Sequence, residues 1–283
     1  MAFIILNHQL LPSEKAFISV DDRGFRFGDG VFETIRVHAG VPYQFDWHAE
    51  RLRKGLGAIK IEANLHRLNE ACRSLLKENK VSEGILRIQV TRGSGSLGYK
   101  PTNATPPTLL IETRALPAMD GAPVSLFLSS YQKISPQMLP VQYKLCQGLS
   151  STLAIMEAEA NGCDEALLLN AKGELCETGS GNIFWVKNAI IYTPMLACGV
   201  LEGAMRASVM RLSPASVCEV AATLADLQDA DEVFITNAVW GVRRVKTLQP
   251  NAISWAEDKA SAALAGLLSA DMKSYCDDHR LRW

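Results

Sequence analysis

Three features of the sequence predict a mixed α/β fold. Leu86 to Arg92 alternates apolar and polar residues with a period of two, as a half-buried strand does. Apolar residues at helical spacing then mark one face of a helix that ends near Lys80: Leu65, Leu68, Cys72, Leu75 and Leu76. Strands and helices alternate along the chain without a regular strand-helix-strand period, which favours a mixed α/β or α+β arrangement over a Rossmann sheet.

The length and composition predict a globular protein with two modest domains. The chain has 283 residues, of which 48% are hydrophobic and 21% are charged, enough for a sizeable core. Residues 116–123 contain two prolines and a glycine and are the predicted linker. The linker divides an N-terminal α/β domain, residues 1–115, from a C-terminal α/β domain, residues 124–283, which carries Lys144.

Charge and cysteine usage narrow the class of protein. The net charge of −1 does not indicate binding to nucleic acid or to an anionic membrane. No window approaches the ~20 apolar residues of a membrane span, and the apolar start lacks the basic leader of a signal peptide. The seven cysteines are scattered without a Cys-x-x-Cys pair, so we expect free thiols in a reducing cytoplasm. The five histidines have no metal-ligand spacing, and no metal is expected.

The remaining elements follow from local patterns. In the first half the expected strands are residues 3–6, 16–20, 86–92 and 109–113, with helices at 47–57 and 65–80 and a hairpin closed by residues 38–42. In the second half the expected strands are 124–128, 165–170, 182–186, 190–193, 217–221, 232–235 and 242–245, and the expected helices are 153–160, 202–212, 224–229 and 256–275.

Lys144 stands at a structural junction. It follows an apolar stretch and precedes Ser150, Ser151 and Thr152, which are suited to cap the helix predicted at 153–160. An ammonium in apolar surroundings loses hydration, so its pKa falls and the nucleophilic amine becomes accessible. A lysine that forms a Schiff base needs this property.

Several blocks in a fixed order resemble the class IV family of pyridoxal-phosphate (PLP) aminotransferases, which includes D-amino-acid and branched-chain enzymes. The resemblance extends from about residue 3 to about residue 246. The matching segments are residues 27–34, 48–52, Lys144, 164–170, 177–184, 199–206 and 235–238. It implies a fold of two α/β domains with the cofactor at their junction, and a homodimer in which loops of the partner complete the site.

The resemblance also implies which residues hold the cofactor, pyridoxal 5'-phosphate. Lys144 would bind the aldehyde, and Glu177 would keep the pyridine nitrogen protonated so that the ring acts as an electron sink. The backbone N–H groups of Ala204 and Met205, at the start of a helix, would face the phosphate. Arg51 would add a bidentate cation, and Leu201 and Asn237 complete the set. His48 is expected to be a hydrogen-bonded structural residue.

Substrate-side residues resemble those of aminodeoxychorismate lyases within the family. Thr34 stands where branched-chain enzymes have a small glycine, and Leu149 stands where those enzymes carry a tyrosine. Tyr99 also fits the lyase, whereas Leu97 replaces the arginine that lyases carry before the Gly-Tyr pair. Arg87, on the polar face of its strand, or Lys100 could then bind a substrate carboxylate.

The activity implied first is that of a lyase converting 4-amino-4-deoxychorismate to 4-aminobenzoate and pyruvate, a step of folate biosynthesis. Lys144 would remove a proton from the amino substrate, and Thr34 would assist departure of the enolpyruvate group. The alternative is an aminotransferase acting on branched-chain or D-amino acids with 2-oxoglutarate, because the first steps are shared. A third reading takes residues 92–98 as the phosphate loop of a non-enzymatic binding protein, although the Gly-Lys-Ser/Thr ending of a P-loop is lacking.

Overall fold

The computed structural model describes residues 2–118 and 121–283, and the chain divides into two compact units. Unit 1 comprises residues 1–117, 143–147 and 272–283, and unit 2 comprises residues 118–142 and 148–271. The division therefore differs from the expected cut at a single linker, because the segment with Lys144 belongs to unit 1. Met1, and Met119 and Asp120 of the predicted linker, lie outside the described residues.

In the described part of the chain, unit 1 contains one six-stranded sheet with strand order β2-β1-β6-β5-β3-β4. Its strands are β1 (Phe3–Leu6), β2 (Gln9–Pro12), β3 (Gly30–His38), β4 (Val41–Pro42), β5 (Gly84–Thr91) and β6 (Thr108–Arg114). Its helices are η1 (Ser13–Lys15), α1 (Arg23–Phe27), α2 (Phe45–Ala58), α3 (Leu68–Glu78) and the terminal η3 (Arg280–Arg282).

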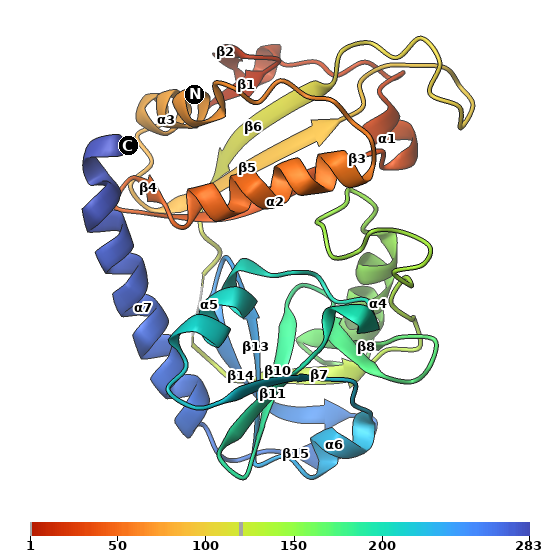
Figure 1. Cartoon of the computed structure of the whole chain (residues 1–283), viewed down its shortest axis with the longest axis vertical. Coiled ribbons are helices and arrows are strands. Elements are labelled where there is room, and N and C mark those ends of the chain that lie inside the picture. Colours follow the sequence, from red (N-terminus) through yellow and green to blue (C-terminus); the bar gives the residue numbers. More distant parts are fainter. Residues whose placement is uncertain (1, 119–120) are drawn as a thin grey trace. The chain divides into compact units, whose positions relative to one another are not determined.

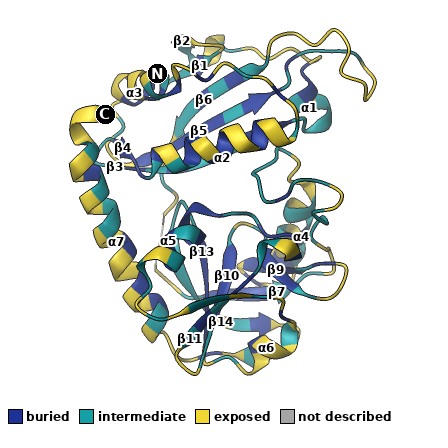
Figure 2. Ribbon diagram, viewed as in Figure 1, coloured by how far each residue is buried: buried dark blue, intermediate teal, exposed yellow. Residues whose placement is uncertain are grey.

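The two faces of this sheet differ. Val31, Ile35 and Leu86 lie on the face that packs against α2 and α3, and these residues share one hydrophobic core. The strands are buried where α2 covers them, whereas the outer side of α2 is exposed (Figure 2). The alternate residues of β3 and β5 are half-buried on the opposite face. The predicted period of two in residues 86–92 is therefore confirmed.

Among the described residues of unit 2, nine strands form a curved sheet that closes on itself. The order is β12-β11-β10-β13-β14-β7-β8-β9, with β15 on β14 and an additional pairing of β9 with β10. The strands are β7 (Val124–Leu128), β8 (Glu165–Leu169), β9 (Leu175–Thr178), β10 (Asn182–Lys187), β11 (Ile190–Pro194), β12 (Val217–Val220), β13 (Glu232–Asn237), β14 (Gly241–Gln249) and β15 (Ile253–Ser254).

Helices α4 (Leu149–Ala160) and α5 (Ala204–Leu212) pack against the outside of this closed sheet, whereas Leu227 of α6 (Leu224–Gln228) joins the apolar cluster of its interior (Figure 1). Inside it, Leu126, Ile183 and Ile235 belong to one apolar cluster. On the outside, alanines of α4 pack against β8. The helices are α4 (Leu149–Ala160), η2 (Leu196–Cys198), α5 (Ala204–Leu212), α6 (Leu224–Gln228) and α7 (Lys259–His279), whose residues from 272 onward belong to unit 1.

Two expected elements were wrong. Residues 16–20 form no strand: Phe17 and Val20 are 83% and 70% exposed, so the apolar pattern there does not mark a buried face. The helix after Lys144 begins at Leu149 with Gly148 as its N-cap, so Ser150 to Thr152 lie in its first turn. The Thr152 hydroxyl donates to the Gly148 carbonyl, a local bond that lets a polar residue sit inside the turn. Three short strands, β2, β9 and β15, were not predicted.

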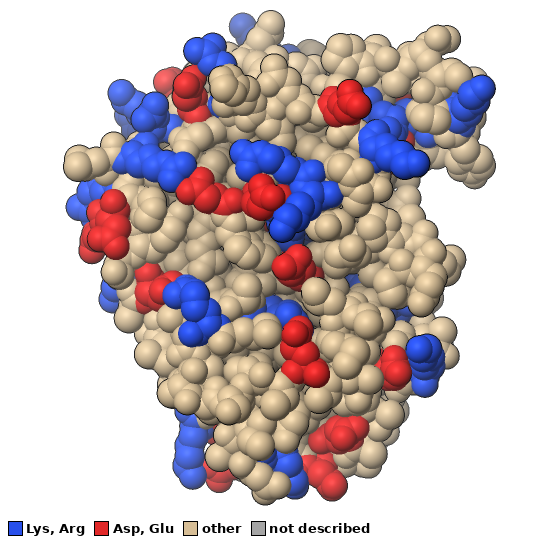
Figure 3. Space-filling view, viewed as in Figure 1, with Lys and Arg blue, Asp and Glu red and all other residues tan. Residues whose placement is uncertain are grey.

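Charge is distributed without a one-sign surface on the face seen in Figure 3, where basic and acidic side chains alternate. All seven cysteines are free. None of the helices in the described residues is long and apolar enough to cross a membrane.

Candidate active site

The segment that carries Lys144 pairs with the start of β3. Its carbonyl accepts from the Phe32 N–H at 2.9 Å, and the Cys146 N–H donates to the Gly30 carbonyl at 2.9 Å. Lys144 is half-buried, and its Nζ lies 4.7 Å from the centre of the Phe32 ring. Burial raises the pKa of the Cys146 thiol to about 11, so this neighbour stays protonated at neutral pH. The Lys144 amine thus stays the predicted nucleophile of this segment.

The open face of the unit 1 sheet places Thr34 and Arg87 directly opposite one another on β3 and β5. The Arg87 guanidinium stacks on the Phe32 ring at 4.1 Å, so two cations, Arg87 and Lys144, lie at one aromatic ring. Glu112 on β6 is 3.9 Å from Arg87, a weak pairing. The predicted proton-transfer, leaving-group and carboxylate-binding residues thus lie close together on one surface.

Arg51 lies in a buried cluster with Glu33 and His48. Its Nε and one terminal nitrogen donate to the Glu33 carboxylate at 2.7 and 2.6 Å, and its guanidinium stacks on Trp47. Although burial alone would raise the pKa of Glu33, the charge of Arg51 and the hydrogen bonds from Arg51 and His48 lower it to about 2. Arg51 is thus held in one orientation, and its binding to a cofactor phosphate stays a prediction.

His48 is fully packed inside this cluster. Its Nδ1 lies 2.6 Å from Glu33, and because the carboxylate only accepts, Nδ1 carries the proton. Burial lowers the pKa of His48, so the imidazole is neutral at neutral pH. This agrees with the expected structural role for His48.

In unit 2, Glu177, Asn182 and Thr236 form a row across three neighbouring strands. Glu177 on β9 is opposite Asn182 on β10, and Asn182 is opposite Thr236 on β13. Directly opposite residues point to the same face of a sheet, and the row spans two strand spacings, about 10 Å. Helix α5 packs against β13. The row therefore places a carboxylate and a hydroxyl on one face with a buried amide between them.

The Glu177 carboxylate already has three donors. Oε1 accepts from the Lys133 ammonium, and Oε2 accepts from the Leu201 N–H at 2.8 Å and from the Asn182 amide at 3.3 Å. Leu201, which was predicted to bind the cofactor, thus positions Glu177 through its backbone. Because a carboxylate has about four lone-pair positions, Glu177 can accept one further hydrogen bond.

The N-terminus of α5 lies beside Asn182. Gly203 is the N-cap of α5 and no side chain caps this end. A Cβ at Gly203 would lie 2.0 Å from the Asn182 Oδ1, so a larger residue there would force the Asn182 amide to move. Ala204 and Met205 are buried at the first turn, where backbone N–H groups lack partners within the helix. Their predicted role toward an anion is consistent with this position.

Asn237 and Thr236 follow one another but have different surroundings. The Asn237 side chain accepts from the backbone N–H groups of Val239 and Trp240 and donates to the Ser180 carbonyl, so it stabilises a turn. The Thr236 hydroxyl is buried and has no hydrogen-bond partner among the described residues. An orphaned buried hydroxyl next to α5 suits an anionic group better than the Asn237 side chain does.

Leu97 and Tyr99 lie on an exposed loop of unit 1. They are 79% and 88% exposed, and the Tyr99 ring lies 5.6 Å from that of Phe27. The buried Arg23 donates to the carbonyls of Gly98 and Tyr99 at 2.8 and 3.1 Å. The structure thus fixes the backbone of this loop and leaves its large side chains exposed.

Four residues of these clusters were not predicted from the sequence: Glu33, Lys133, Asn182 and Thr236. Glu33 and Asn182 lay inside matched blocks, and a buried position next to a predicted site residue was the available signal. Thr236 directly precedes Asn237 on β13, so the two side chains point to opposite faces of the strand. Lys133 lies 44 residues before Glu177 in the chain, and no local pattern marked it.

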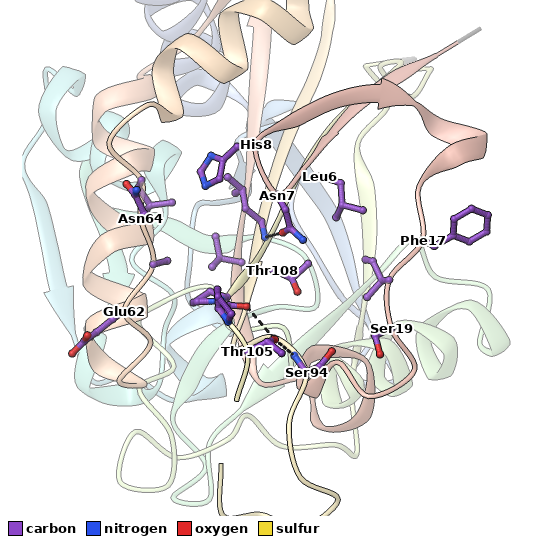
Figure 4. A pocket seen from close by; sticks show the side chains of 17 residues that line it. Leu6, Asn7, His8, Phe17, Ser19, Glu62, Asn64, Ser94, Thr105 and Thr108 are labelled. Atoms are coloured by element: carbon purple, nitrogen blue, oxygen red, sulfur yellow. Dashed lines mark hydrogen bonds between the residues drawn. The ribbon is translucent and has the colours of Figure 1, made fainter. Parts of the chain in front are cut away.

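A separate hollow of about 650 Å³ opens in unit 1 (Figure 4). Asn7, His8 and Glu62 lie on its wall, and Phe17 lies at its edge. None of the predicted site residues is among the described residues that line it. The hollow is thus distinct from the clusters around Lys144 and Glu177.

Comparison with known proteins shows the family to which the chain belongs. Residues 30–248 match the model of the family described as amino-transferase class IV. A protein of Methanocaldococcus jannaschii, provisionally named a branched-chain-amino-acid aminotransferase, is 30% identical, with 99% of this chain and 97% of that protein covered. An aminodeoxychorismate lyase of Vibrio harveyi is also 30% identical, over 90% of this chain and 97% of the relative.

Solved structures agree. A branched-chain amino acid aminotransferase from T.th., solved with pyridoxamine 5'-phosphate, matches with a TM-score of 0.90 and 27% identity, over 98% of this chain and 97% of that one. The mixed α/β fold is thereby confirmed. The chain belongs to the class IV aminotransferase family, whose enzymes depend on pyridoxal phosphate. The reading as a non-enzymatic phosphate-binding protein is therefore wrong.

The residues present fit this cofactor. Lys144 of unit 1 offers an amine, and Glu177 of unit 2 offers a carboxylate with one acceptor position left. Unit 2 also contains the unpartnered Thr236 hydroxyl and the uncapped N-terminus of α5, which are suited to a phosphate. When bound, pyridoxal phosphate supplies an electron sink for carbanion chemistry next to an amine.

Proposed function

We propose that the protein is an aminodeoxychorismate lyase, which releases pyruvate from 4-amino-4-deoxychorismate and leaves 4-aminobenzoate. The observation that carries this proposal is the pairing of Thr34 with Arg87 on the open face that also bears Lys144. A dicarboxylate substrate needs a cation, the loss of enolpyruvate needs a proton donor near the leaving oxygen, and the amino carbon needs a base. The three side chains offer these three groups on one surface.

Each residue has a stated task in this proposal. Lys144 removes the proton from the carbon that bears the amino group, and Thr34 donates a hydrogen bond to the departing enolpyruvate oxygen. Arg87 binds a carboxylate, since it is half-buried and its pairing with Glu112 at 3.9 Å is weak. Glu177 accepts a hydrogen bond from the cofactor ring nitrogen through its fourth lone-pair position. In unit 2, Thr236, Ala204 and Met205 are the proposed phosphate donors, and for Arg51 of unit 1 the resemblance predicts the same task.

The test is a product assay. Purified protein loaded with pyridoxal phosphate is incubated with enzymatically made 4-amino-4-deoxychorismate, and pyruvate and 4-aminobenzoate are measured together. We expect equimolar products that a Lys144→Ala variant does not form. A cofactor-loaded protein that forms neither product contradicts the lyase.

The alternative is an aminotransferase for branched-chain or D-amino acids with 2-oxoglutarate. Leu97 favours it, because an apolar residue replaces the arginine expected of a lyase, and the names of several relatives also favour it. Arg87 would then bind the distal carboxylate of 2-oxoglutarate. Formation of glutamate from 2-oxoglutarate and an amino donor, with no 4-aminobenzoate from the other substrate, would select this activity.

We further propose that the protein is a homodimer of the reducing cytoplasm. The free cysteines support the compartment. Large apolar side chains of unit 1 are exposed, which supports burial against a second copy. These residues are Phe17, Val20, Phe25, Leu97 and Tyr99, with exposed fractions of 83%, 70%, 76%, 79% and 88%. Light scattering on the eluted protein tests the dimer, and a monomeric mass at micromolar concentration contradicts it.

A further inference from the structure

Lys133 is the cation that contacts the proposed partner of the cofactor ring. It lies in the segment after β7, and its ammonium bonds to the Glu177 Oε1. The two side chains are 14% and 8% exposed. A lysine so little exposed is uncommon unless it is paired. Lys133 and Glu177 therefore form a largely buried ion pair within unit 2.

The position of Lys133 is fixed at three points. Its backbone N–H donates to the Leu169 carbonyl at 2.9 Å. Its side-chain stem packs at Gly199, where a Cβ would lie 3.6 Å from the Lys133 Cγ and 3.3 Å from the Ile134 carbonyl oxygen. Gly199 has a φ of +97°, a conformation that favours glycine. Backbone, stem and ammonium together direct this charge at Glu177.

Among the described residues of unit 2 that donate to the Glu177 carboxylate, Lys133 is the cation. On β9, burial raises the pKa of Cys176 to about 12, and at the end of η2 burial raises the pKa of Cys198, so both thiols are neutral. The donors from β10 and from the segment before α5 are the Asn182 amide and the Leu201 N–H, which carry no net charge. Glu174 on the β8–β9 turn bonds to Asn170.

We propose that Lys133 is a positioning residue that shares the negative charge of Glu177 and so weakens its hold on the ring-nitrogen proton of the cofactor. This inference rests on the proposed role of Glu177. With a protonated ring bound, two cations face one carboxylate, and the second cation disfavours the proton on the first. Lys133 thereby sets how readily the ring nitrogen loses its proton, and hence how strong an electron sink the enzyme maintains.

The experiment observes the ring nitrogen itself. Wild type, Lys133→Met, Lys133→Gln, Lys133→Arg and Glu177→Gln are loaded with pyridoxal phosphate labelled with ¹⁵N in the ring, and the ¹⁵N chemical shift is followed against pH. We expect the deprotonation midpoint of the neutral variants to rise by about one pH unit, while the arginine variant stays near wild type. Lys187→Met, a lysine of β10 that donates to the Asp229 carbonyl, is the matched control and should not change it.

A midpoint that stays or falls in both neutral variants overturns the inference, because a purely structural lysine predicts that result. Failure of the proposed function looks different. If Glu177→Gln leaves the midpoint unchanged, then Glu177 is not the ring partner, whatever Lys133 does.

A second measurement needs no cofactor. Urea unfolding of the apoprotein compares Lys133→Met, Glu177→Gln and the double variant. We expect Lys133→Met to lower the unfolding midpoint more in wild type than in the Glu177→Gln background, because only in the former is a buried carboxylate left without its cation. Additive effects would show that the pair has no coupling and would also overturn the inference.

Discussion

Glu33 of unit 1 and Glu177 of unit 2 are buried carboxylates with three donors each, yet their surroundings differ. The donors to Glu33 come from His48 and Arg51, three residues apart on α2. The donors to Glu177 come from three separate segments: Lys133 after β7, Asn182 on β10 and Leu201 before α5. The first cluster is local to one strand and one helix within a hydrophobic core, whereas the second depends on the closed sheet of unit 2.

This difference teaches where charge is used for structure and where it is available for chemistry. The Glu33 cluster fixes the direction of one arginine, and its carboxylate is deep in the core of unit 1. The Glu177 cluster lies on the outer face of its sheet, in a row with Thr236. We therefore expect a ligand to add to the Glu177 cluster without displacing a residue of the apolar cluster on the other face.

The largest expected effect is the loss of activity when the reactive amine of Lys144 is removed, since neither carboxylate cluster contains this residue. Replacing Lys144 by Ala should lower kcat by about 10³-fold or more, because the proton-transfer group is lost while Glu33 and Glu177 keep their partners. Turnover of the proposed substrate measures this effect. Lys133→Ala serves as the comparison, and an equally large loss there with Lys144→Ala still active would reverse the assignment of the two lysines.

Glu33→Gln tests whether the unit 1 cluster is structural. We expect the free energy of unfolding to fall by about 3 to 5 kcal/mol, because Arg51 keeps a buried charge without its carboxylate. Denaturant unfolding at neutral pH measures the loss. A loss below about 1 kcal/mol would mean that Arg51 has sufficient partners without Glu33.

Glu33→Gln should also change how the free energy of unfolding depends on pH. The pKa of Glu33 is lowered from its ordinary value of 4.5 to about 2, so the unfolded chain binds the extra proton between these values and stability falls as pH falls through them. This part of the acid-induced loss, about 3 kcal/mol, should be absent in Glu33→Gln. Unfolding free energies of both proteins between pH 5 and pH 2 give the answer, and parallel curves would contradict the shift.

Arg87→Met probes the open face, where charge is available for a substrate. KM for the anionic substrate should rise by about 10- to 100-fold, with a smaller change in kcat, because a charge-assisted hydrogen bond to the substrate is lost. Arg36→Met is the matched control, since Arg36 lies on the same face of β3 and pairs with the exposed Glu83. An unchanged KM in Arg87→Met removes Arg87 from the substrate site.

The smallest expected effect concerns two glycines that both serve as helix N-caps. Gly203→Ala should cost about 1 to 3 kcal/mol more than Gly148→Ala, because a Cβ would meet Asn182 at Gly203 and meets nothing within 4 Å at Gly148. The loss of a glycine cap is common to both variants and cancels. Thermal unfolding measures the pair, and equal losses would mean that Asn182 can move aside at little cost.

The elements that were predicted correctly have local determinants. The strand 86–92, the helix α2 and the start of the α5 helix follow from period, spacing and glycine placement, and the buried His48 was expected. The prediction failed at residues 16–20, where the apolar side chains of Phe17, Ile18 and Val20 are exposed and form no buried face. The helix start at Leu149 was missed, because Ser and Thr are favoured as caps yet also occur inside a first turn.

Individual residues of the candidate site were predicted from the sequence, but the hydrogen bonds and ion pairs between them were not. Glu177 was singled out, but Lys133 was not, because only the pairing of distant strands brings the two together. The choice of Asn237 over Thr236 shows the same limit. Neighbouring residues of a strand point to opposite faces of the sheet. Only the pairing of the strands shows that Thr236 shares a face with Asn182 and Glu177.

The most direct test is to find the lysine that holds the cofactor. The protein is loaded with pyridoxal phosphate, reduced with borohydride and digested, and the modified peptide is identified by mass spectrometry. We expect the label on Lys144 and an unmodified Lys133. A label on Lys133, or an unmodified Lys144 in a protein that retains the cofactor, would contradict the assignment of Lys144 as the reactive amine.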